Sequence, residues 1–354
     1  MSQTRLKVAL VFGGRSGEHE VSVRSARSVA AALAERHDVI ALFIDKQGQW
    51  LLQPGAPAES GGTPVFLAGQ PADGGRLRRL SDAAVVAMPD IYFPVLHGTY
   101  GEDGTIQGLF EMAGAAYVGA GVAASAAGMD KELMKALFAQ AGIPQGPYRV
   151  LSAHRPAEHV RVLDALGLPV FVKPANLGSS VAVSKVKSAD ALAAALALAF
   201  EYDDKVLVEA GIDCRELEIS ILGNEAPRAS LPGEIVPDRE FYDYDSKYSA
   251  QSTTKLVIPA QLPEATLRHA QELGVRAFQA IGGAGYARVD FFLDRKTGEL
   301  LVNEINTIPG FTSISMFPKL WEAASLPYAE LVSELVRLGR ERHDTRARLR
   351  TDYR

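Results

Sequence analysis

The sequence has a single cysteine, Cys214, no excess of positive charge and no long apolar segment. One cysteine excludes an intramolecular disulfide and is typical of a reducing compartment, so we expect a cytoplasmic protein. The 37 lysines and arginines against 42 aspartates and glutamates give a net charge of −5, which argues against a general nucleic-acid binder. The longest apolar run, Ala191–Phe200, is far shorter than the ~20 residues of a membrane helix. Val8–Phe12 is too short for the core of a signal peptide, so membrane and secreted classes are excluded.

The length of 354 residues allows two or three domains with cores of their own. The first segment predicts a buried strand at Leu6–Phe12, a glycine loop at Gly13–Gly17 and a helix over Val21–Arg36. Later features are a surface excursion at Gln53–Gly75 and apolar strands at Val39–Ile44 and Ala84–Val95. This alternation predicts a doubly wound, mostly parallel sheet over residues 1 to about 125.

The pattern changes after this first sheet. Asp130 is placed to cap a helix that runs to Gln140. A small α+β unit follows, with strands at Pro169–Lys173, Val181–Val186 and Lys205–Glu209 and a helix at Ala189–Phe200. From residue 219 the chain is rich in strands and contains a polar, aromatic loop, Arg239–Thr254, that is long enough to act as a lid.

A predicted hairpin carries the strongest chemical signal. Strands at Tyr286–Asp294 and Glu299–Asn306 are joined by a turn that ends in Gly298. If Lys296–Gly298 is the loop, paired residue numbers add up to 594. Asp290 then faces Glu304, Arg288 faces Asn306, and all four side chains share one face.

Two carboxylates on opposed strands lie about 5 Å apart, where they repel by roughly 3 kcal/mol at an effective dielectric of 20. A hard cation would relieve that repulsion, and the oxygen ligands of Asp290, Glu304 and Asn306 suit Mg²⁺ or Mn²⁺. The alternative is that Arg288 alone neutralises the two carboxylates as an ordinary ion pair. The hairpin by itself leaves both interpretations open.

A second signal is a loop suited to phosphate. Lys173 ends a strand, and the segment Asn176–Ser180 then offers a glycine, two hydroxyls and consecutive backbone amides. The loop is not a P-loop, because no lysine follows its glycine and it joins two strands. Taken alone, such a glycine-serine loop is more often a simple turn. Lys131, at the start of a helix, is equally ambiguous, because most such lysines are solvated. Glu209 and Glu216 are candidates for adenine and ribose contacts, or else ordinary edge charges.

The glycine loop after the first strand does not match the dinucleotide fingerprint G-x-G-x-x-G. Glu18 and Glu20 follow it, where a pyrophosphate would need free helix amides. Two carboxylates there repel an anionic cofactor and attract an ammonium group, although acidic residues also favour a helix N-terminus for purely structural reasons. A dehydrogenase is therefore disfavoured.

Taken together, these motifs closely resemble the D-alanine–D-alanine ligase family of the ATP-grasp superfamily, from about residue 5 to residue 335. The motifs that carry the resemblance are Phe12–Ser22, His97–Thr105, Met129–Lys131, Val172–Pro174 with Gly178–Ser180, Phe241–Tyr248 and Asn303–Gly310. The resemblance implies an N-terminal α/β domain (1–125), a central ATP-grasp lobe (126–218) and a C-terminal ATP-grasp lobe (219–340) with the lid loop 239–254.

The resemblance also implies roles for individual residues. Two Mg²⁺ or Mn²⁺ ions would be held by Asp290, Glu304 and Asn306. ATP would contact Lys131, Phe171, Lys173, Ser179, Ser180, Glu209, Ala210, Ile212, Glu216, Lys247, Phe292, Asn303 and Glu304. The amino-acid substrates would contact Glu18, His97, Arg288, Gly310, Ser315 and Met316. The catalytic set would be Glu18, Ser179, Tyr248, Arg288 and Gly310, with Tyr248 and Ser179 tying the lid to Glu18.

The implied activity is ATP-dependent formation of D-alanyl-D-alanine through a D-alanyl phosphate, by a homodimer that binds neither nucleic acid nor membranes. Three alternatives differ from it. A ligase could use D-lactate or D-serine as acceptor, although Tyr248 resembles the dipeptide-forming enzymes. A regulator without catalysis is disfavoured by the intact set of metal ligands and by Arg288. Another ATP-grasp ligase is opposed by the Glu18 motif and the lid loop.

Overall fold

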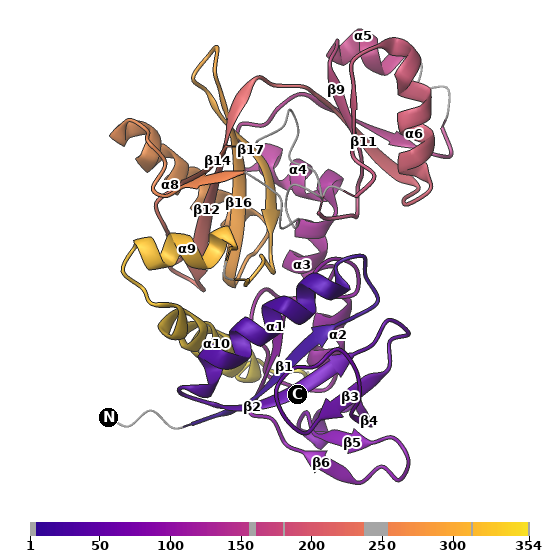
Figure 1. The fold of residues 1–354 in the computed structure, drawn as a ribbon, viewed down its shortest axis with the longest axis vertical. Helices are drawn as coiled ribbons and strands as arrows, with labels where there is room; N and C mark the ends of the chain where they lie inside the picture. Colours follow the sequence, from indigo (N-terminus) through magenta and orange to yellow (C-terminus); the bar gives the residue numbers. More distant parts are fainter. Residues whose placement is uncertain (1–4, 156–160, 180, 237–253, 313, 353–354) are drawn as a thin grey trace.

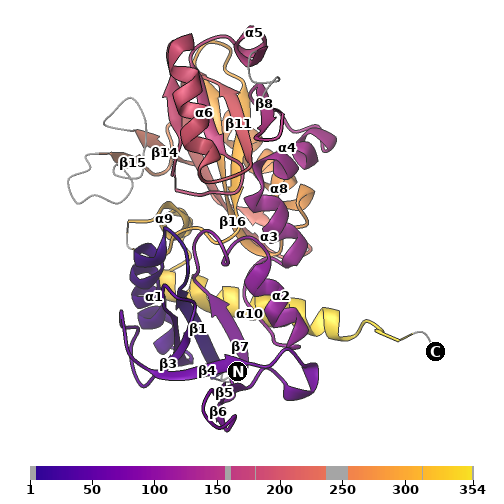
Figure 2. The same ribbon diagram turned by 90° about the vertical axis from the view of Figure 1, so that its right-hand side faces the viewer.

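The computed structural model describes residues 5–155, 161–179, 181–236, 254–312 and 314–352. Its strands form three sheets, each built from one consecutive part of the chain (Figure 1). The first sheet lies at one end of the molecule and the other two lie at the opposite end (Figure 2). None of the helices in the described residues is long and apolar enough to cross a membrane.

The first sheet has the order β6-β5-β4-β3-β2-β1-β7. Its strands are β1 (Lys7–Gly13), β2 (Asp38–Ile44), β3 (Trp50–Gln53), β4 (Thr63–Leu67), β5 (Leu77–Arg79), β6 (Val85–Ala87) and β7 (Ile91–Pro94). The predicted class, α/β followed by α+β, is confirmed. Only β1 pairs in parallel, with β2 and β7, so the prediction of a mostly parallel sheet is wrong beyond β2. The predicted surface excursion, Gln53–Gly75, instead contains β4. The connection between β3 and β4 is short, and a short connection joins neighbouring strands in antiparallel order.

Three helices cover this sheet: α1 (His19–Ala34), α2 (Thr105–Met112) and α10 (Tyr328–Ala347). Helix α10 comes from the far end of the chain, yet Leu331 and Leu335 belong to the same core as Phe12 and Val29. The hydroxyl of Ser28 on α1 also donates to the hydroxyl of Tyr328 at 3.1 Å. The C-terminal helix therefore completes the core of the N-terminal sheet.

The pH dependence of stability follows from His37, which is 3% exposed between α1 and β2. Neither ring nitrogen has a hydrogen-bond partner among the described residues. Burial, and then the positive charges of Arg5 and Arg36, lower the pKa of His37. Below pH ~6.5 His37 therefore binds a proton in the unfolded chain but stays neutral in the folded protein. We expect the free energy of unfolding to fall as the pH drops.

This expectation is tested by chemical denaturation at pH 7.5 and pH 5.5. His37→Leu should reduce the difference in unfolding free energy between the two pH values. The exposed His269→Leu is the matched control, because an exposed imidazole stays hydrated when it is charged. An unchanged pH dependence in His37→Leu would contradict this role of His37.

The second sheet has the order β10-β9-β11-β8 and is antiparallel throughout. Its strands are β8 (Tyr148–Ser152), β9 (Val170–Pro174), β10 (Ser184–Val186) and β11 (Lys205–Ala210). Helices α5 (Val162–Leu166) and α6 (Leu192–Phe200), the latter preceded by the 3₁₀ turn η3 (Ala189–Ala191), pack on it. The strands predicted here are found, with β10 beginning later than expected.

The third sheet has the order β15-β14-β12-β16-β17, with β13 paired to β12. Its strands are β12 (Cys214–Gly223), β13 (Arg228–Ala229), β14 (Gly233–Val236), β15 (Lys255–Val257), β16 (Gly285–Asp294) and β17 (Leu300–Asn306). The remaining helices of the described residues are α3 (Val122–Met129), α4 (Lys131–Gln140), α8 (Glu264–Ala280), α9 (Met316–Ala323) and the 3₁₀ turn η1 (Pro71–Asp73). Helix α8 packs on the face that carries Leu217, Ile219 and Val289, and alternate residues therefore point to the opposite face.

The register of β16 and β17 agrees with the prediction where the chemistry lies. Asp290 pairs with Glu304 and Arg288 pairs with Asn306. Nearer the turn the register is shifted by one, because Phe291 pairs with Val302 and a bulge makes Asn303 the extra residue. Asn303 and Glu304 consequently both face the same cavity, although they are neighbours in sequence.

Candidate active site

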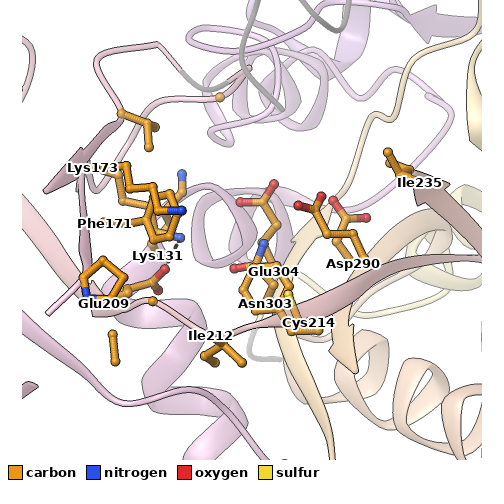
Figure 3. Close-up of a pocket in the computed structure, with 18 of the residues that line it drawn as sticks. Lys131, Phe171, Lys173, Glu209, Ile212, Cys214, Ile235, Asp290, Asn303 and Glu304 are labelled. Atoms are coloured by element: carbon orange, nitrogen blue, oxygen red, sulfur yellow. Dashed lines mark ion pairs between the residues drawn. The ribbon is translucent and has the colours of Figure 1, made fainter. Parts of the chain in front are cut away.

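A cavity of about 590 Å³ lies between the second and third sheets (Figure 3). Lys131, Lys173 and Glu209 lie on one side of it, and Asp290 and Glu304 lie on the other. The predicted site residues that line the cavity are Lys131, Phe171, Lys173, Ser179, Glu209, Ala210, Ile212, Glu216, Asp290, Phe292, Asn303 and Glu304. The structure thus gathers around one space every described residue assigned to ATP and two of the three assigned to metal, Asp290 and Glu304.

The basic side of the cavity is built on β9, β11 and α4. Lys173 Nζ lies 2.6 Å from Glu209 Oε2, and Lys135 Nζ lies 2.9 Å from Glu209 Oε1. Burial alone would raise the pKa of Glu209, but the charges of Lys173 and Lys135 outweigh it and lower the pKa to about 2. Burial lowers the pKa of Lys131. This side therefore keeps an ionised Glu209 between two lysines and a third lysine nearby.

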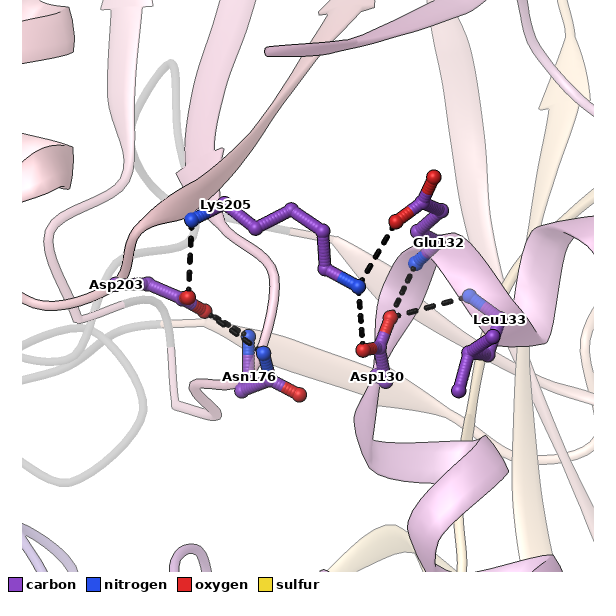
Figure 4. A network of polar contacts seen from close by, with 6 residues as sticks. All are labelled: Asp130, Glu132, Leu133, Asn176, Asp203 and Lys205. Carbon is purple, nitrogen blue, oxygen red and sulfur yellow. Dashed lines mark hydrogen bonds and ion pairs between the residues drawn. The ribbon is translucent and has the colours of Figure 1, made fainter. Parts of the chain in front are cut away.

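The start of α4 is fixed by a polar network (Figure 4). The Asp130 side chain caps the helix as predicted, accepting from the amides of Glu132 and Leu133 at 3.0 and 3.1 Å. Lys205 of β11 lies 2.5 Å from Asp130 Oδ2. Asp203 accepts from the Asn176 backbone and side-chain nitrogens at 2.7 and 2.9 Å. The network therefore holds Lys131 and the base of the glycine-serine loop in fixed relative positions.

The acidic side of the cavity is a row of carboxylates across three neighbouring strands. Glu218 on β12 pairs in register with Asp290 on β16, which pairs with Glu304 on β17. Arg288 donates from Nε and Nη2 to the two Asp290 oxygens at 2.6 and 2.7 Å, and its Nε is 3.1 Å from Glu218 Oε2. Burial alone would lower the pKa of Arg288, but Asp290 and Glu218 raise it well above its usual value.

The donor set on this side fits a hard divalent cation. On this side three carboxylates lie in register around one guanidinium, and Asn306 Nδ2 donates to Asp290 Oδ2 at 3.2 Å. Among the described residues no group of three His, Cys, Asp or Glu side chains is arranged as a ready metal site. The candidate ligands are instead two carboxylates and an amide, and ATP phosphates and water would complete the coordination.

The glycine-serine loop meets the first sheet at Glu18. The Ser179 hydroxyl donates to Glu18 Oε1, although the two residues are far apart in sequence. Ser179 adopts a left-handed backbone conformation with φ of 51°. A Cβ on Gly178 would lie 3.0 Å from Glu18 Oε2, and one on Gly98 would lie 2.9 Å from it. Close approach of two loop backbones to one carboxylate therefore depends on these two glycines.

His97 has a supporting position next to this junction. Its Nδ1 is 3.0 Å from the Ile308 carbonyl oxygen and its Nε2 is 3.1 Å from the Ser25 hydroxyl. Burial lowers the pKa of His97. Glu102 joins the same loops, because it accepts from the Gly98 amide at 2.8 Å and from the Ile308 amide at 3.1 Å. Burial and the charge of Glu18 raise the pKa of Glu102.

The residues predicted for the second amino acid lie outside the main cavity lining. Ser315 Oγ accepts from the Thr312 amide at 3.0 Å, and a Cβ on Gly310 would lie 2.8 Å from that oxygen. Met316 begins α9, is 5% exposed and packs with Ile235 in a small apolar cluster. The structure thus brings Gly310 and Ser315 together and turns Met316 into the core.

Some predicted residues cannot be placed. Ser180, Lys247 and Tyr248, and the loop 239–254 except Thr254, lie outside the described residues. Cys214 lines the cavity, where burial raises the pKa of its thiol to about 12, so that it stays protonated.

The sequence analysis missed three buried charged residues of the site: Lys135, Glu218 and Glu102. Lys135 follows Lys131 by one helical turn, which was an available signal for a shared face. Glu218 follows Glu216 by two residues on a strand, which was the same kind of signal. Glu102 lies inside the His97–Thr105 motif.

Comparison with known proteins agrees with this geometry. Two family models match the chain, "D-ala D-ala ligase N-terminus" over residues 7–120 and "D-ala D-ala ligase C-terminus" over residues 137–337. A D-alanine–D-alanine ligase of Heliobacterium modesticaldum is 50% identical, covering 99% of this chain and 98% of the relative. D-alanine–D-alanine ligase A of Bradyrhizobium diazoefficiens is 47% identical, with 99% of both chains covered.

Solved structures give the same result. The D-alanine–D-alanine ligase from Coxiella burnetii has a TM-score of 0.83 and 38% identity, with 97% of both chains covered. The VanG D-Ala:D-Ser ligase from Enterococcus faecalis has a TM-score of 0.85 and 33% identity, covering 95% of this chain and 100% of that one.

The fold is that of the ATP-grasp enzymes, and the class is an ATP-dependent ligase. More narrowly, the chain belongs to the D-alanine–D-alanine ligase family. The family and enzyme class expected from the sequence motifs are thereby confirmed.

Proposed function

We propose that this protein joins two D-alanine molecules into D-alanyl-D-alanine, with ATP cleaved to ADP and phosphate, for peptidoglycan precursor synthesis. The observation that carries the proposal is the contact between Ser179 and Glu18. It connects the loop that faces the phosphate side of the cavity with the carboxylate suited to a substrate ammonium group. An amino acid held by Glu18 would therefore present its carboxylate toward a nucleotide in the cavity.

The first chemical step activates a carboxylate, which is a poor electrophile. A carboxylate oxygen of the first D-alanine attacks the γ-phosphorus, the bond from that phosphorus to the ADP oxygen breaks, and D-alanyl phosphate forms. Lys131 and Lys173 would bind phosphate oxygens, with the Ser179 and Ser180 loop above them. The adenine base would be surrounded by Phe171, Ala210, Ile212, Phe292 and Asn303. Glu209 would bind the edge of the base, and Glu216 would bind the ribose.

The second step forms the peptide bond. The neutral amine of the second D-alanine attacks the acyl carbon, and the carbon–oxygen bond to phosphate breaks as phosphate leaves. Arg288 and the Gly310 amide would stabilise the tetrahedral oxyanion, while Ser315, with Met316 beside it, would hold the carboxylate of the second substrate. An acyl phosphate hydrolyses in water, so we assign the exclusion of water to the loop 239–254 with Lys247 and Tyr248.

Two divalent ions, Mg²⁺ or Mn²⁺, complete the proposed site. When bound by Asp290, Glu304 and Asn306, they would neutralise the negative charge that moves onto ADP. Three further proposals concern the whole chain: a three-part division at residues 1–125, 126–218 and 219–340, a homodimer, and a cytoplasmic location, which the single cysteine also favours.

The proposed function is tested by measuring phosphate release from ATP and Mg²⁺ with D-alanine alone, or with added D-serine or D-lactate, and by identifying the products by mass spectrometry. We expect D-alanyl-D-alanine as the main product from D-alanine and from each mixture. L-Alanine replaces D-alanine in the control reaction and should give no dipeptide.

If D-alanyl-D-serine or D-alanyl-D-lactate exceeds D-alanyl-D-alanine, the assigned acceptor is wrong. The fold and the first half-reaction would be unaffected by that result. D-Serine is the acceptor to examine most closely, because the VanG structure is a D-Ala:D-Ser ligase. Absence of turnover with every pair would overturn the proposal.

A further inference from the structure

Glu218 has no part in the metal set proposed above, yet it is built into the site. It is 7% exposed, lines the cavity and lies directly across from Asp290 in the register of β12 and β16. Its Oε2 is 3.1 Å from Arg288 Nε, the same nitrogen that donates to Asp290 Oδ1 at 2.6 Å. One guanidinium therefore lies between two carboxylates.

The observed pairing of Arg288 with Asp290 conflicts with the separate roles proposed for these residues. Both Asp290 oxygens accept from Arg288, at 2.6 and 2.7 Å. A carboxylate held in this bidentate way has one lone pair of each oxygen occupied, so a cation that approaches Asp290 from the same side competes with Arg288 for them. In turn, the Nε donor and one Nη2 donor of Arg288 point at Asp290 and not at an oxyanion. A cation bound on this side of Asp290 therefore requires Arg288 to give up these contacts.

We infer that Glu218 is a positioning residue, which keeps Arg288 paired when Asp290 releases it to bind a divalent cation. Glu218 Oε2 is already within ion-pair distance of Arg288, so the guanidinium can change partners without leaving the site. Its positive charge stays paired throughout, which matters because an unpaired buried charge is costly. The inference deepens the proposed function, on which it rests for the cation at Asp290 and for the use made of the released guanidinium.

This exchange also connects two parts of the site. Metal binding at Asp290 would free the Nη2 donor of Arg288, and Glu218 would hold the guanidinium through Nε. The Nη2 donor that now binds Asp290 would thus become available to an oxyanion when the metal is bound. A glutamate at position 218 would then affect both metal affinity and turnover while touching neither metal nor substrate.

The test is a titration of the protein with Mn²⁺ in the presence of ADP, with free Mn²⁺ measured by electron paramagnetic resonance. The variants are Glu218→Gln, Arg288→Met and the double variant. We expect Glu218→Gln to weaken Mn²⁺ binding about tenfold, since Arg288 then has a poorer alternative to Asp290. Arg288→Met should tighten binding, and adding Glu218→Gln to it should change nothing further.

The double variant separates this mechanism from a direct effect of the Glu218 charge. If Glu218→Gln weakens Mn²⁺ binding by the same factor with and without Arg288, Glu218 acts on the cation itself and the inference is wrong. Glu234→Gln is the matched control, because Glu234 also binds an arginine, Arg215, through both oxygens at 2.7 and 2.6 Å. Glu234 pairs with Leu217, on the face of the sheet away from the cavity, so Mn²⁺ binding should stay unchanged.

Thermal unfolding is recorded for every variant. If Glu218→Gln does not fold, Glu218→Asp replaces it, because it keeps the charge while its shorter side chain withdraws the oxygens from Arg288. Weaker Mn²⁺ binding in that variant, but not in its Arg288→Met background, supports the inference, and equal weakening in both opposes it. If the wild-type protein makes the dipeptide but the effect of Glu218 on Mn²⁺ binding does not depend on Arg288, the inference is wrong and the proposed function stands. If that dependence is found but no dipeptide is made, the inference stands and the proposed function is wrong.

Discussion

Glu304→Gln is expected to lower the rate of ATP-dependent dipeptide formation by roughly a thousandfold, with the protein still folded. Glu304 stands at the end of the carboxylate row, opposite Asp290, and lines the cavity. Glutamine keeps the size of the side chain but removes the charge that a hard cation requires. Loss of one of two facing carboxylates also relieves repulsion in the metal-free protein, so folding should not suffer.

The measurement combines ADP release with circular dichroism of the purified variant. Glu299→Gln is the matched control, because it makes the same substitution at an exposed position beside the turn of the same hairpin. Its activity should equal that of the wild-type protein. Full activity in folded Glu304→Gln would overturn the metal assignment.

Glu209→Gln is expected to destabilise the fold by about 3 kcal/mol, because it removes the shared partner of two buried lysines. Lys135 and Lys173 are 2% and 8% exposed, and each forms an ion pair with one Glu209 oxygen. The ionised Glu209, with its pKa lowered to about 2, stabilises the folded protein above pH ~4.3, and this contribution is lost as the pH falls toward 2. Glu209→Gln should therefore also reduce the acid sensitivity of unfolding.

Lys135→Met is the matched comparison for this prediction. It removes one lysine but leaves Glu209 paired with Lys173, so the unfolding free energy should change by less than about 1 kcal/mol. Both variants are compared by urea denaturation at pH 7 and at pH 4. A larger loss of stability in Lys135→Met than in Glu209→Gln would contradict this description of the cluster.

The hairpin illustrates how far sequence reasoning reaches. The predicted loop was one residue too short, and the structure has a bulge at Asn303. The two differences cancel, so that Asp290 faces Glu304 as predicted. Strand alternation and turn type are local properties, and they fix which side chains share a face. A bulge depends on tertiary packing and has no comparable local signal.

Other parts of the site could not be predicted because they depend on distant contacts. The contact of Ser179 with Glu18 joins two loops that approach only after the sheets assemble. The motif resemblance suggested this contact, whereas spacing alone did not. In the sequence, Lys135 is indistinguishable from a solvated lysine on a helix, so its buried ion pair with Glu209 could not be predicted. The antiparallel strands β3, β4 and β5 were likewise missed, because their short and mixed sequences show no clear periodicity.

The return of α10 to the first sheet has a consequence for biosynthesis. Phe12 and Val29 leave the ribosome well before Leu331 and Leu335, which complete their core and follow only after both later sheets have been made. During that interval the apolar surface of β1 and α1 lacks its final covering, and such surfaces attract one another and chaperones. The nascent N-terminal unit must therefore be sheltered while the two later sheets are made and folded.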